Sequence, residues 1–477
     1  MNDRMIRNIL GWLLIFECGF MLVPAVTAIV YGERELWYFL MTMFFCGSLG
    51  GLLVMKKPEK SVLYAKEGFI IVALSWIILS LFGALPFFLS GCIPNYVDAL
   101  FETVSGFTTT GASILTEVES LPKCMLIWRS FTHWVGGMGV LVFVMAFVPL
   151  SGGQNMHIMK AESPGPSVSK LVPRVKTTAL ILYSIYLVMT FILFVLLLFG
   201  RMSPFEALNT SFGTAGTGGF GIRNDSLASF SPYIQIVVTV FMLLFSVNFS
   251  CYYLFLLGRF KEAFNTELRR FIYLVGIVIL IITLNVRGMF STLGEALRYV
   301  SFTVASIVST TGFATVDFNV WPELSRTLLV MVMFTGACAG STCGGIKISR
   351  LMILFRGAFH EIGNLAHPHR VKRIAIDKRP LEPEVVRSTN VYIAWYVLLF
   401  FLSVVLISFD DHDLITNFTA VAATFNNVGP GLNMVGPTGN FAFFSIPSKL
   451  VLIFDMLAGR LELFPMLVLF SPATWRK

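Results

Sequence analysis

The stretch Thr108-Thr-Thr-Gly-Ala112 lies between two long apolar segments, and its form recurs three times further along the chain. Each copy has a short run of small and apolar residues, then a turn centred on glycine, then a return toward the next apolar segment. The four stretches run from Asp98 to Ala112, Phe205 to Gly219, Tyr299 to Phe313 and Asn417 to Pro430. A fourfold internal repeat predicts four similar units around one axis.

The composition predicts a membrane protein. Of 477 residues, 56% are hydrophobic and 13% are charged, and the mean hydropathy is +0.78. Soluble domains carry roughly 25% charged residues. These values exclude a soluble enzyme, a disordered protein and a solvated repeat array.

Ten apolar stretches are long enough to cross a hydrocarbon core, which takes about 20 residues. The first is of full span length and lacks a small-residue cleavage site, so we expect no cleavable signal peptide. The stretches are 9–31, 36–55, 67–90, 126–150, 177–200, 233–257, 271–286, 324–354, 391–409 and 446–470.

The basic residues indicate the orientation of these spans. With both termini inside, the inner segments hold 25 Lys and Arg, and the outer segments hold 9. This asymmetry satisfies the positive-inside rule. The net charge of +8 is therefore explained by the membrane topology, and it gives no support to nucleic-acid binding.

The glycine turns have the chemistry of a potassium filter. Irregular backbone at membrane depth survives where it is buried or lines a water-filled path. Four extended turns at one axis would direct carbonyl oxygens inward, which is how a K⁺ filter replaces the ion's hydration shell. Glycine suits such turns because it adopts positive φ and has no Cβ. A divalent-ion site would need a carboxylate ring, and none is found at the turns.

Together these features resemble the Trk/Ktr/HKT superfamily of potassium transporters, and most closely its bacterial Trk branch. The resemblance covers essentially the whole chain. It rests on Thr-Thr-Thr-Gly-Ala (108–112), the segment 128–139, Ser-Thr-Thr-Gly-Phe (309–313), Gly-Ser-Thr-Cys-Gly-Gly-Ile-Lys (340–347) and Gly-Arg-Leu-Glu (459–462).

The resemblance implies a single filter with K⁺ ligands from all four turns. The expected ligands are Thr109, Thr110, Gly111, Gly216, Thr217, Gly218, Thr310, Thr311, Gly312, Asn427, Val428 and Gly429. In the HKT branch, serine at the position of Gly111 accompanies Na⁺ preference, so this glycine favours K⁺. The fourth turn departs most from Thr-Thr-Gly, so we expect an asymmetric ring with looser discrimination.

The expected fold is an all-α polytopic membrane protein with two leading transmembrane helices. Four repeats of span, re-entrant pore loop and span follow around a central pore. The expected parts are two leading helices (1–60), pore repeats at 61–155, 156–262, 263–360 and 391–477, and a basic cytosolic linker (361–390).

The third repeat contains a break in its second span. Four glycines fall within the ten residues 336–345, although each costs about 1 kcal/mol relative to alanine in a helix. One interpretation is close packing of small residues between helices. The other, supported by the resemblance, is a flexible gate that obstructs the inner pore. Its expected residues are Gly336, Gly340, Ser341, Thr342, Gly344, Gly345 and Lys347.

Arg460 lies in mid-span, where an arginine must face a water-filled path or a partner. It is either part of a structural ion pair with another span or, as the resemblance suggests, a positive barrier in the pore. Glu102 either buttresses the filter or contacts the path by which the ion enters. His133 is expected to be a satisfied buried histidine. Cys92 and Cys124 can pair in an oxidising periplasm.

The resemblance also implies partners and an activity. It implies a multi-pass protein of the bacterial inner membrane, a homodimer, and a soluble nucleotide-binding regulator like TrkA. The transported ion is K⁺, with Rb⁺ as a substitute, and no cofactor is expected. Coupling to H⁺ or Na⁺ stays open as an alternative. An intramembrane enzyme is disfavoured because no nucleophile–base pair or His-Glu-x-x-His metal set is found.

Overall fold

The computed structural model describes residues 2–55, 64–139, 175–367, 374–377 and 379–475. These residues are mostly helical. A two-residue antiparallel ladder joins β1 (Ala375–Ile376) to β2 (Arg379–Pro380), with Ala375 opposite Pro380. The predicted all-α class is therefore confirmed at the level of helix content.

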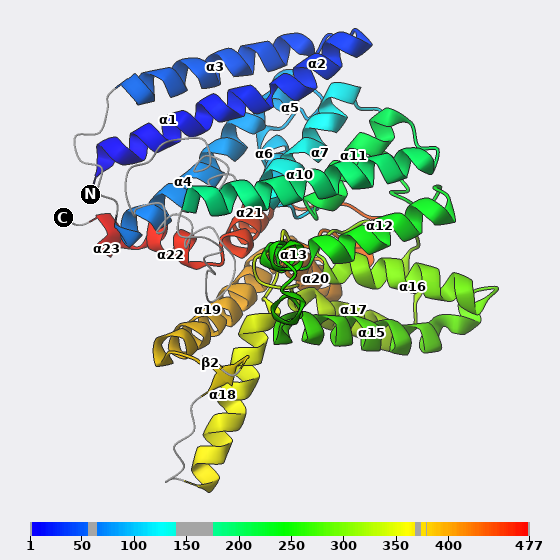
Figure 1. The fold of residues 1–477 in the computed structure, drawn as a ribbon. Helices are drawn as coiled ribbons and strands as arrows, with labels where there is room; N and C mark the ends of the chain where they lie inside the picture. Colours follow the sequence, from blue (N-terminus) through cyan, green and yellow to red (C-terminus); the bar gives the residue numbers. More distant parts are fainter. Residues whose placement is uncertain (1, 56–63, 140–174, 368–373, 378, 476–477) are drawn as a thin grey trace.

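Three helices precede the repeats. They are α1 (Asp3–Phe20), α2 (Leu22–Tyr31) and α3 (Leu36–Met55). Helices α1 and α3 lie side by side at one edge of the molecule (Figure 1). Glycines permit this approach, because a Cβ on Gly50 would lie 2.8 Å from the Gly11 carbonyl oxygen. Helix α1 also packs on α4 (Ala65–Gly83).

Four units of similar form follow. Each has a long helix, a short helix and a second helix that ends early. The first unit contains α4, α5 (Leu85–Leu89), α6 (Tyr96–Phe107) and α7 (Lys123–Gly137). The second contains α10 (Val175–Phe199), α11 (Pro204–Ala215), α12 (Pro232–Phe245), α13 (Phe249–Leu256) and α14 (Phe260–Ala263).

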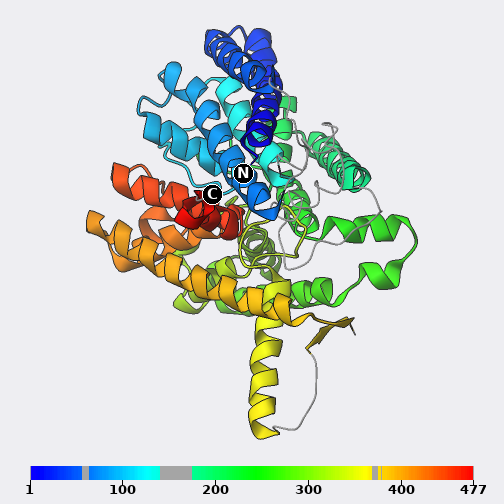
Figure 2. The ribbon, with the colours of Figure 1, turned by 90° about the vertical axis from the view of Figure 1, so that its left-hand side faces the viewer.

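The third unit contains α15 (Thr266–Val286), α16 (Leu293–Val308), α17 (Glu323–Phe334) and α18 (Ile348–Ala366). The fourth contains α19 (Pro383–Ile407), α20 (Leu414–Phe425), α21 (Ile446–Arg460), α22 (Phe464–Phe470) and α23 (Pro472–Trp475). Short 3₁₀ turns lie at Arg287–Met289, Phe318–Val320, Ser408–Asp410 and Asn433–Val435. Helix α18 projects away from the body of the molecule (Figures 1 and 2).

The short helices begin in the same way in all four units. The residue before each helix accepts a hydrogen bond from a backbone N–H of the first turn, which satisfies one of the unpaired N–H groups. These N-cap residues are Asn95, Ser203, Thr292 and Asp413. Local sequence therefore defines where each short helix starts.

The four units form a closed ring. The second helix of each unit packs on the short helix of the next: α7 on α11, α12 on α16, α17 on α20 and α21 on α6. The last contact returns from the fourth unit to the first. The short helices α6, α11, α16 and α20 are therefore each held between their own unit and a neighbour.

Two of the second helices are divided where continuous spans were expected. Among the described residues, six helices are long and apolar enough to cross a membrane, or seven if the bent pair α12–α13 is one span. That pair turns by 91°, because the Asn248 side chain caps a new helix by accepting from the Ser250 N–H. The expected span at 446–470 is likewise divided, where Glu462 and Leu463 adopt positive φ.

The predicted break in the third unit is confirmed, since α17 ends at Phe334 and α18 begins at Ile348. The expected span at 126–150 can be followed only to residue 139, because 140–174 lie outside the described residues. The predicted boundaries at 60 and 155 lie outside them as well, so the proposed division into parts stays a prediction.

Candidate functional site

The four glycine turns share one backbone conformation. In each, the first left-handed residue follows the short helix by two positions; these residues are Thr109, Thr217, Thr310 and Asn427, with φ of 56°, 54°, 53° and 54°. A glycine two residues later is again left-handed; these are Gly111, Gly219, Gly312 and Gly429, with φ of 80°, 79°, 83° and 97°.

The backbone N–H groups of the turns point back into the short helices. In the first turn, Thr109 N–H donates to Gly106 and Thr110 N–H donates to Ser105, at 3.1 and 2.9 Å. The other three turns repeat this pair of bonds. It is a Schellman-type helix end, which requires a left-handed residue. Since these N–H groups are used internally, the turns present carbonyl oxygens to their surroundings.

Close approaches join the turns in a ring. A Cβ placed on the last glycine of each turn would collide with the middle carbonyl oxygen of the next turn. The distances are 2.0 Å from Gly111 to Gly218, 1.8 Å from Gly219 to Thr311, 2.4 Å from Gly312 to Val428 and 2.8 Å from Gly429 to Thr110. The four glycines also line one cavity of about 200 Å³. Glycine is therefore required by the neighbouring turn as well as by its own φ.

The second turn corrects the register expected from the sequence. We expected Gly216, Thr217 and Gly218 as its triplet. By conformation, the triplet equivalent to Thr109–Gly111 is Thr217, Gly218 and Gly219. Gly216 ends the short helix in a right-handed conformation and abuts the His133 carbonyl oxygen, 2.2 Å from its ideal Cβ. When Thr217 is aligned with the first left-handed residue of the other turns, Gly219 takes the position of their last glycine.

The loop Thr335–Lys347 contains all seven expected gate residues and is not helical. Its ends lie together: Gly336 N–H donates to the Ile346 carbonyl oxygen at 2.8 Å. A Cβ on Gly336 would lie 2.4 Å from the Gly344 carbonyl oxygen, so small residues are required where the loop returns on itself. The buried Lys347 ammonium donates to the carbonyl oxygens of Cys343 and Gly344.

The middle of this loop touches the turns. Gly344 N–H donates to the Thr310 hydroxyl at 2.8 Å, and the Thr217 hydroxyl lies 3.3 Å from the Thr342 hydroxyl. A Cβ on Gly344 would lie 2.4 Å from the Asn426 carbonyl oxygen. The loop is thus seated directly against three of the four turns.

Arg460 connects the loop to the first unit. Its guanidinium donates to the Thr342 carbonyl oxygen at 2.7 Å, and to the carbonyl oxygens of Gly136 and Gly137 at 2.6 and 2.7 Å. It also reaches the Thr109 hydroxyl at 3.3 Å. Arg460 and Lys347 line a second cavity of about 70 Å³ beside the loop. Two cationic groups therefore lie next to the turns.

Comparison with known proteins identifies the family of this chain. The family model described as "TrkH: Cation transport protein" matches residues 37–477.

The chain belongs to the TrkH family.

Similar members of the TrkH family match along the whole chain. The Trk system potassium uptake protein TrkH of Escherichia coli K12 is 36% identical, over 100% of both chains. TrkG of the same organism is 32% identical, over 99% of both. A crystal structure of the potassium transporter TrkH from Vibrio parahaemolyticus matches with a TM-score of 0.90 and 32% identity, over 100% of both chains. The expected resemblance is confirmed, and TrkH-family proteins are transporters rather than enzymes.

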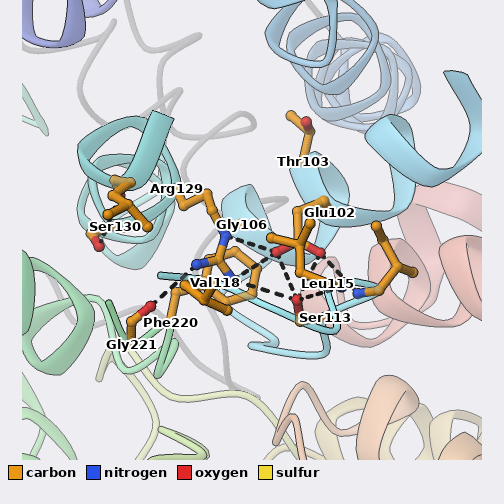
Figure 3. A network of polar contacts seen from close by, with 12 residues as sticks. Glu102, Thr103, Gly106, Ser113, Leu115, Val118, Arg129, Ser130, Phe220 and Gly221 are labelled. Atoms are coloured by element: carbon orange, nitrogen blue, oxygen red, sulfur yellow. Dashed lines mark hydrogen bonds and ion pairs between the residues drawn. The ribbon is translucent and has the colours of Figure 1, made fainter. Parts of the chain in front are cut away.

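A buried ion pair supports the first turn of this TrkH-family chain. Arg129 of α7 donates to the Glu102 carboxylate at 2.8 Å, and Ser113 donates to the same carboxylate. Both contacts are drawn in Figure 3. Arg129 also donates to the Gly221 carbonyl oxygen in the second turn region, at 3.2 Å. Glu102 is 1% exposed. Its contacts match the buttressing role rather than contact with the ion.

His133 bridges the same two units. Its Nδ1 lies 2.7 Å from the Gly106 carbonyl oxygen, and its Nε2 accepts from the Phe220 N–H at 3.2 Å. These contacts require a neutral ring with its proton on Nδ1. The expectation of a satisfied buried histidine agrees with this geometry.

The remaining expected features have separate places. Glu462 pairs with Arg350 of α18, whose guanidinium stacks 4.1 Å above the Tyr392 ring. Cys92 and Cys124 are free thiols. The basic residues Arg370, Lys372, Arg373 and Lys378 of the expected linker lie outside the described residues.

Proposed function

We propose that this protein takes up K⁺ across the bacterial inner membrane through a ten-span, four-loop pore. The ring of carbonyl oxygens from the four turns is its selectivity filter. The observation that carries the proposal is the closed cycle of contacts, in which each turn's glycine abuts the carbonyl group of the next turn. The names of the relatives support K⁺ as the ion, since several are potassium uptake proteins.

The filter is formed by Thr109–Gly111, Thr217–Gly219, Thr310–Gly312 and Asn427–Gly429. A ring of neutral oxygen dipoles replaces the water shell of a monovalent cation. The fourth turn lacks the Thr-Thr-Gly pattern, so discrimination between K⁺ and Na⁺ is looser than in a strictly fourfold ring. Rb⁺ passes in place of K⁺.

The loop Thr335–Lys347 is the gate, and Arg460 is a positive barrier that holds the loop closed. Hydrogen bonds support these two roles. Thr342 and Gly344 bond to the turns, and Thr342 also accepts from Arg460. The protein acts as a homodimer with both termini in the cytoplasm. A cytosolic nucleotide-binding subunit regulates the gate.

Coupling of K⁺ to H⁺ or Na⁺ is the second candidate activity. The test is ion flux in liposomes that hold the purified protein, compared for K⁺, Rb⁺, Na⁺ and Li⁺ with and without a proton gradient. Flux of K⁺ and Rb⁺ that follows their own gradients supports a channel. Flux that requires a H⁺ or Na⁺ gradient supports symport. Absence of K⁺ and Rb⁺ flux with the regulatory subunit present would contradict the proposed function.

A further inference from the structure

The four residues at the first left-handed position of the turns share a second property. All four side chains are fully buried, and each directs an oxygen toward the gate loop or toward Arg460. They are Thr109, Thr217, Thr310 and Asn427. We call their side-chain oxygens the inner oxygen set.

Three members of this set are engaged by the loop and by Arg460. Thr310 accepts from the Gly344 N–H, Thr217 lies against the Thr342 hydroxyl, and Thr109 accepts from the Arg460 guanidinium. The groups that meet Thr310 and Thr109 are hydrogen-bond donors, and the donor to Thr109 is positively charged. Neutral oxygens of this kind are also what a dehydrated monovalent cation binds.

The fourth member is left without a partner. Asn427 Oδ1 is buried and accepts no hydrogen bond from the described residues. Its orientation is defined by the amide nitrogen, which donates to the Thr110 hydroxyl and to the Met456 carbonyl oxygen, each at 2.9 Å. The oxygen faces the loop, 3.1 Å from the ideal Cβ position of Gly344. A buried acceptor without a donor costs free energy, so this oxygen is available to a ligand.

We propose that the inner oxygen set is a K⁺ site that the docked loop occupies, so that K⁺ and the loop compete for the same oxygens. The inference rests on the proposed function and adds a form of regulation to it. When the loop withdraws, the Thr310 oxygen loses its donor, and the Thr217 and Asn427 oxygens lose the loop atoms that cover them. A K⁺ ion then binds in place of the loop. Because a ligand that binds one state alone shifts the population toward that state, K⁺ favours the undocked loop.

Native cysteines of the chain can report loop docking. Cys343 lies inside the loop and is buried with its sulfur 3.3 Å from the Ser246 hydroxyl. Cys124 is buried in α7, away from the loop, and is a matched internal reference. The experiment measures N-ethylmaleimide modification of each cysteine by mass spectrometry on the purified full-length protein, as K⁺ replaces Na⁺ or Li⁺ at constant ionic strength.

We expect K⁺ and Rb⁺ to accelerate modification of Cys343 and to leave Cys124 unchanged. Asn427→Val removes one ligand and should raise the half-maximal K⁺ concentration about tenfold, the equivalent of roughly 1.4 kcal/mol. Asn427→Thr restores an oxygen and should recover the wild-type value. Thr283→Val is a matched control, because Thr283 is a buried threonine of α15 outside this set.

Modification of Cys343 that is insensitive to K⁺, or slowed by it, would overturn the proposal. So would an Asn427→Val protein with the wild-type K⁺ dependence. If Asn427→Val does not fold, Thr310→Val compared with Thr310→Ser gives the same test. K⁺ flux in liposomes that persists while Cys343 shows no K⁺ response would refute this inference and leave the proposed function intact.

Discussion

The ring of turns and the loop that contacts it differ in how many of the four units contribute to them. The ring takes one turn from each unit, and every turn has the same φ pattern and the same helix-end hydrogen bonds. The loop comes from the third unit alone and meets the turns through different groups at each contact. The proposed filter therefore takes one part from each unit. The proposed gate is a single segment, which can move without replacing any of those parts.

Gly219→Ala tests the ring where its contacts are tightest and should have the largest effect. A Cβ there would lie 1.8 Å from the Thr311 carbonyl oxygen, at a φ of 79°. Overpacking of this kind costs about 1–3 kcal/mol, so K⁺ uptake should fall roughly 5- to 150-fold. Uptake is measured as ⁸⁶Rb⁺ flux in liposomes. Gly276→Ala in α15 is the control, because its Cβ would meet open space. Normal flux in the Gly219 variant would show that this glycine is not part of the filter.

Gly344→Ala tests the loop while keeping the four glycines of the ring. A Cβ there would lie 2.4 Å from the Asn426 carbonyl oxygen, so the docked loop becomes strained. We expect flux in the absence of the regulatory subunit to rise about tenfold, equivalent to roughly 1.4 kcal/mol, with the K⁺ to Na⁺ ratio unchanged. Gly363→Ala in α18, which has open space at its Cβ, should behave as wild type. A change in ion preference with unchanged flux would assign Gly344 to the filter instead.

Arg460→Ala separates the barrier from a purely structural role. It removes the donors to the Thr342, Gly136 and Gly137 carbonyl oxygens. We expect K⁺ flux to rise roughly three- to tenfold, which corresponds to about 0.7–1.4 kcal/mol. Arg460→Lys keeps the charge, so its K⁺ flux should lie between that of the wild type and that of Arg460→Ala. Loss of the protein from the membrane fraction in Arg460→Ala, with Arg460→Lys unaffected, would favour a structural role.

Gly429→Ala probes the weakest point of the ring and should have the smallest effect. Its Cβ would lie 2.8 Å from the Thr110 carbonyl oxygen, the longest of the four close approaches. We expect a decrease in the ratio of K⁺ to Na⁺ flux of less than about tenfold. If the ratio of K⁺ to Na⁺ flux fell more in Gly429→Ala than in Gly219→Ala, the fourth turn would dominate selectivity despite its different sequence.

The sequence by itself determined the repeated parts. Asn95, Ser203, Thr292 and Asp413 cap the short helices locally, and a glycine turn follows the end of each short helix. The glycines of 336–345 also indicated a break, because four glycines within ten residues destabilise a helix. These features were predictable since each depends on the conformational preference of a residue and its near neighbours in the chain.

The tertiary structure decided which groups meet. Gly218 and Gly219 are indistinguishable by composition, and the contact with Thr311 selects the second as the last residue of the triplet. The bend after Phe245 and the break at Leu463 appear where apolar sequence would allow a straight span. Asn427 Oδ1 has no donor among the residues that the structure describes. Arg460 donates to the carbonyl oxygens of Gly136 and Gly137, residues more than 300 positions away. Such contacts arise when four units close into a ring, and no local preference in the chain encodes them.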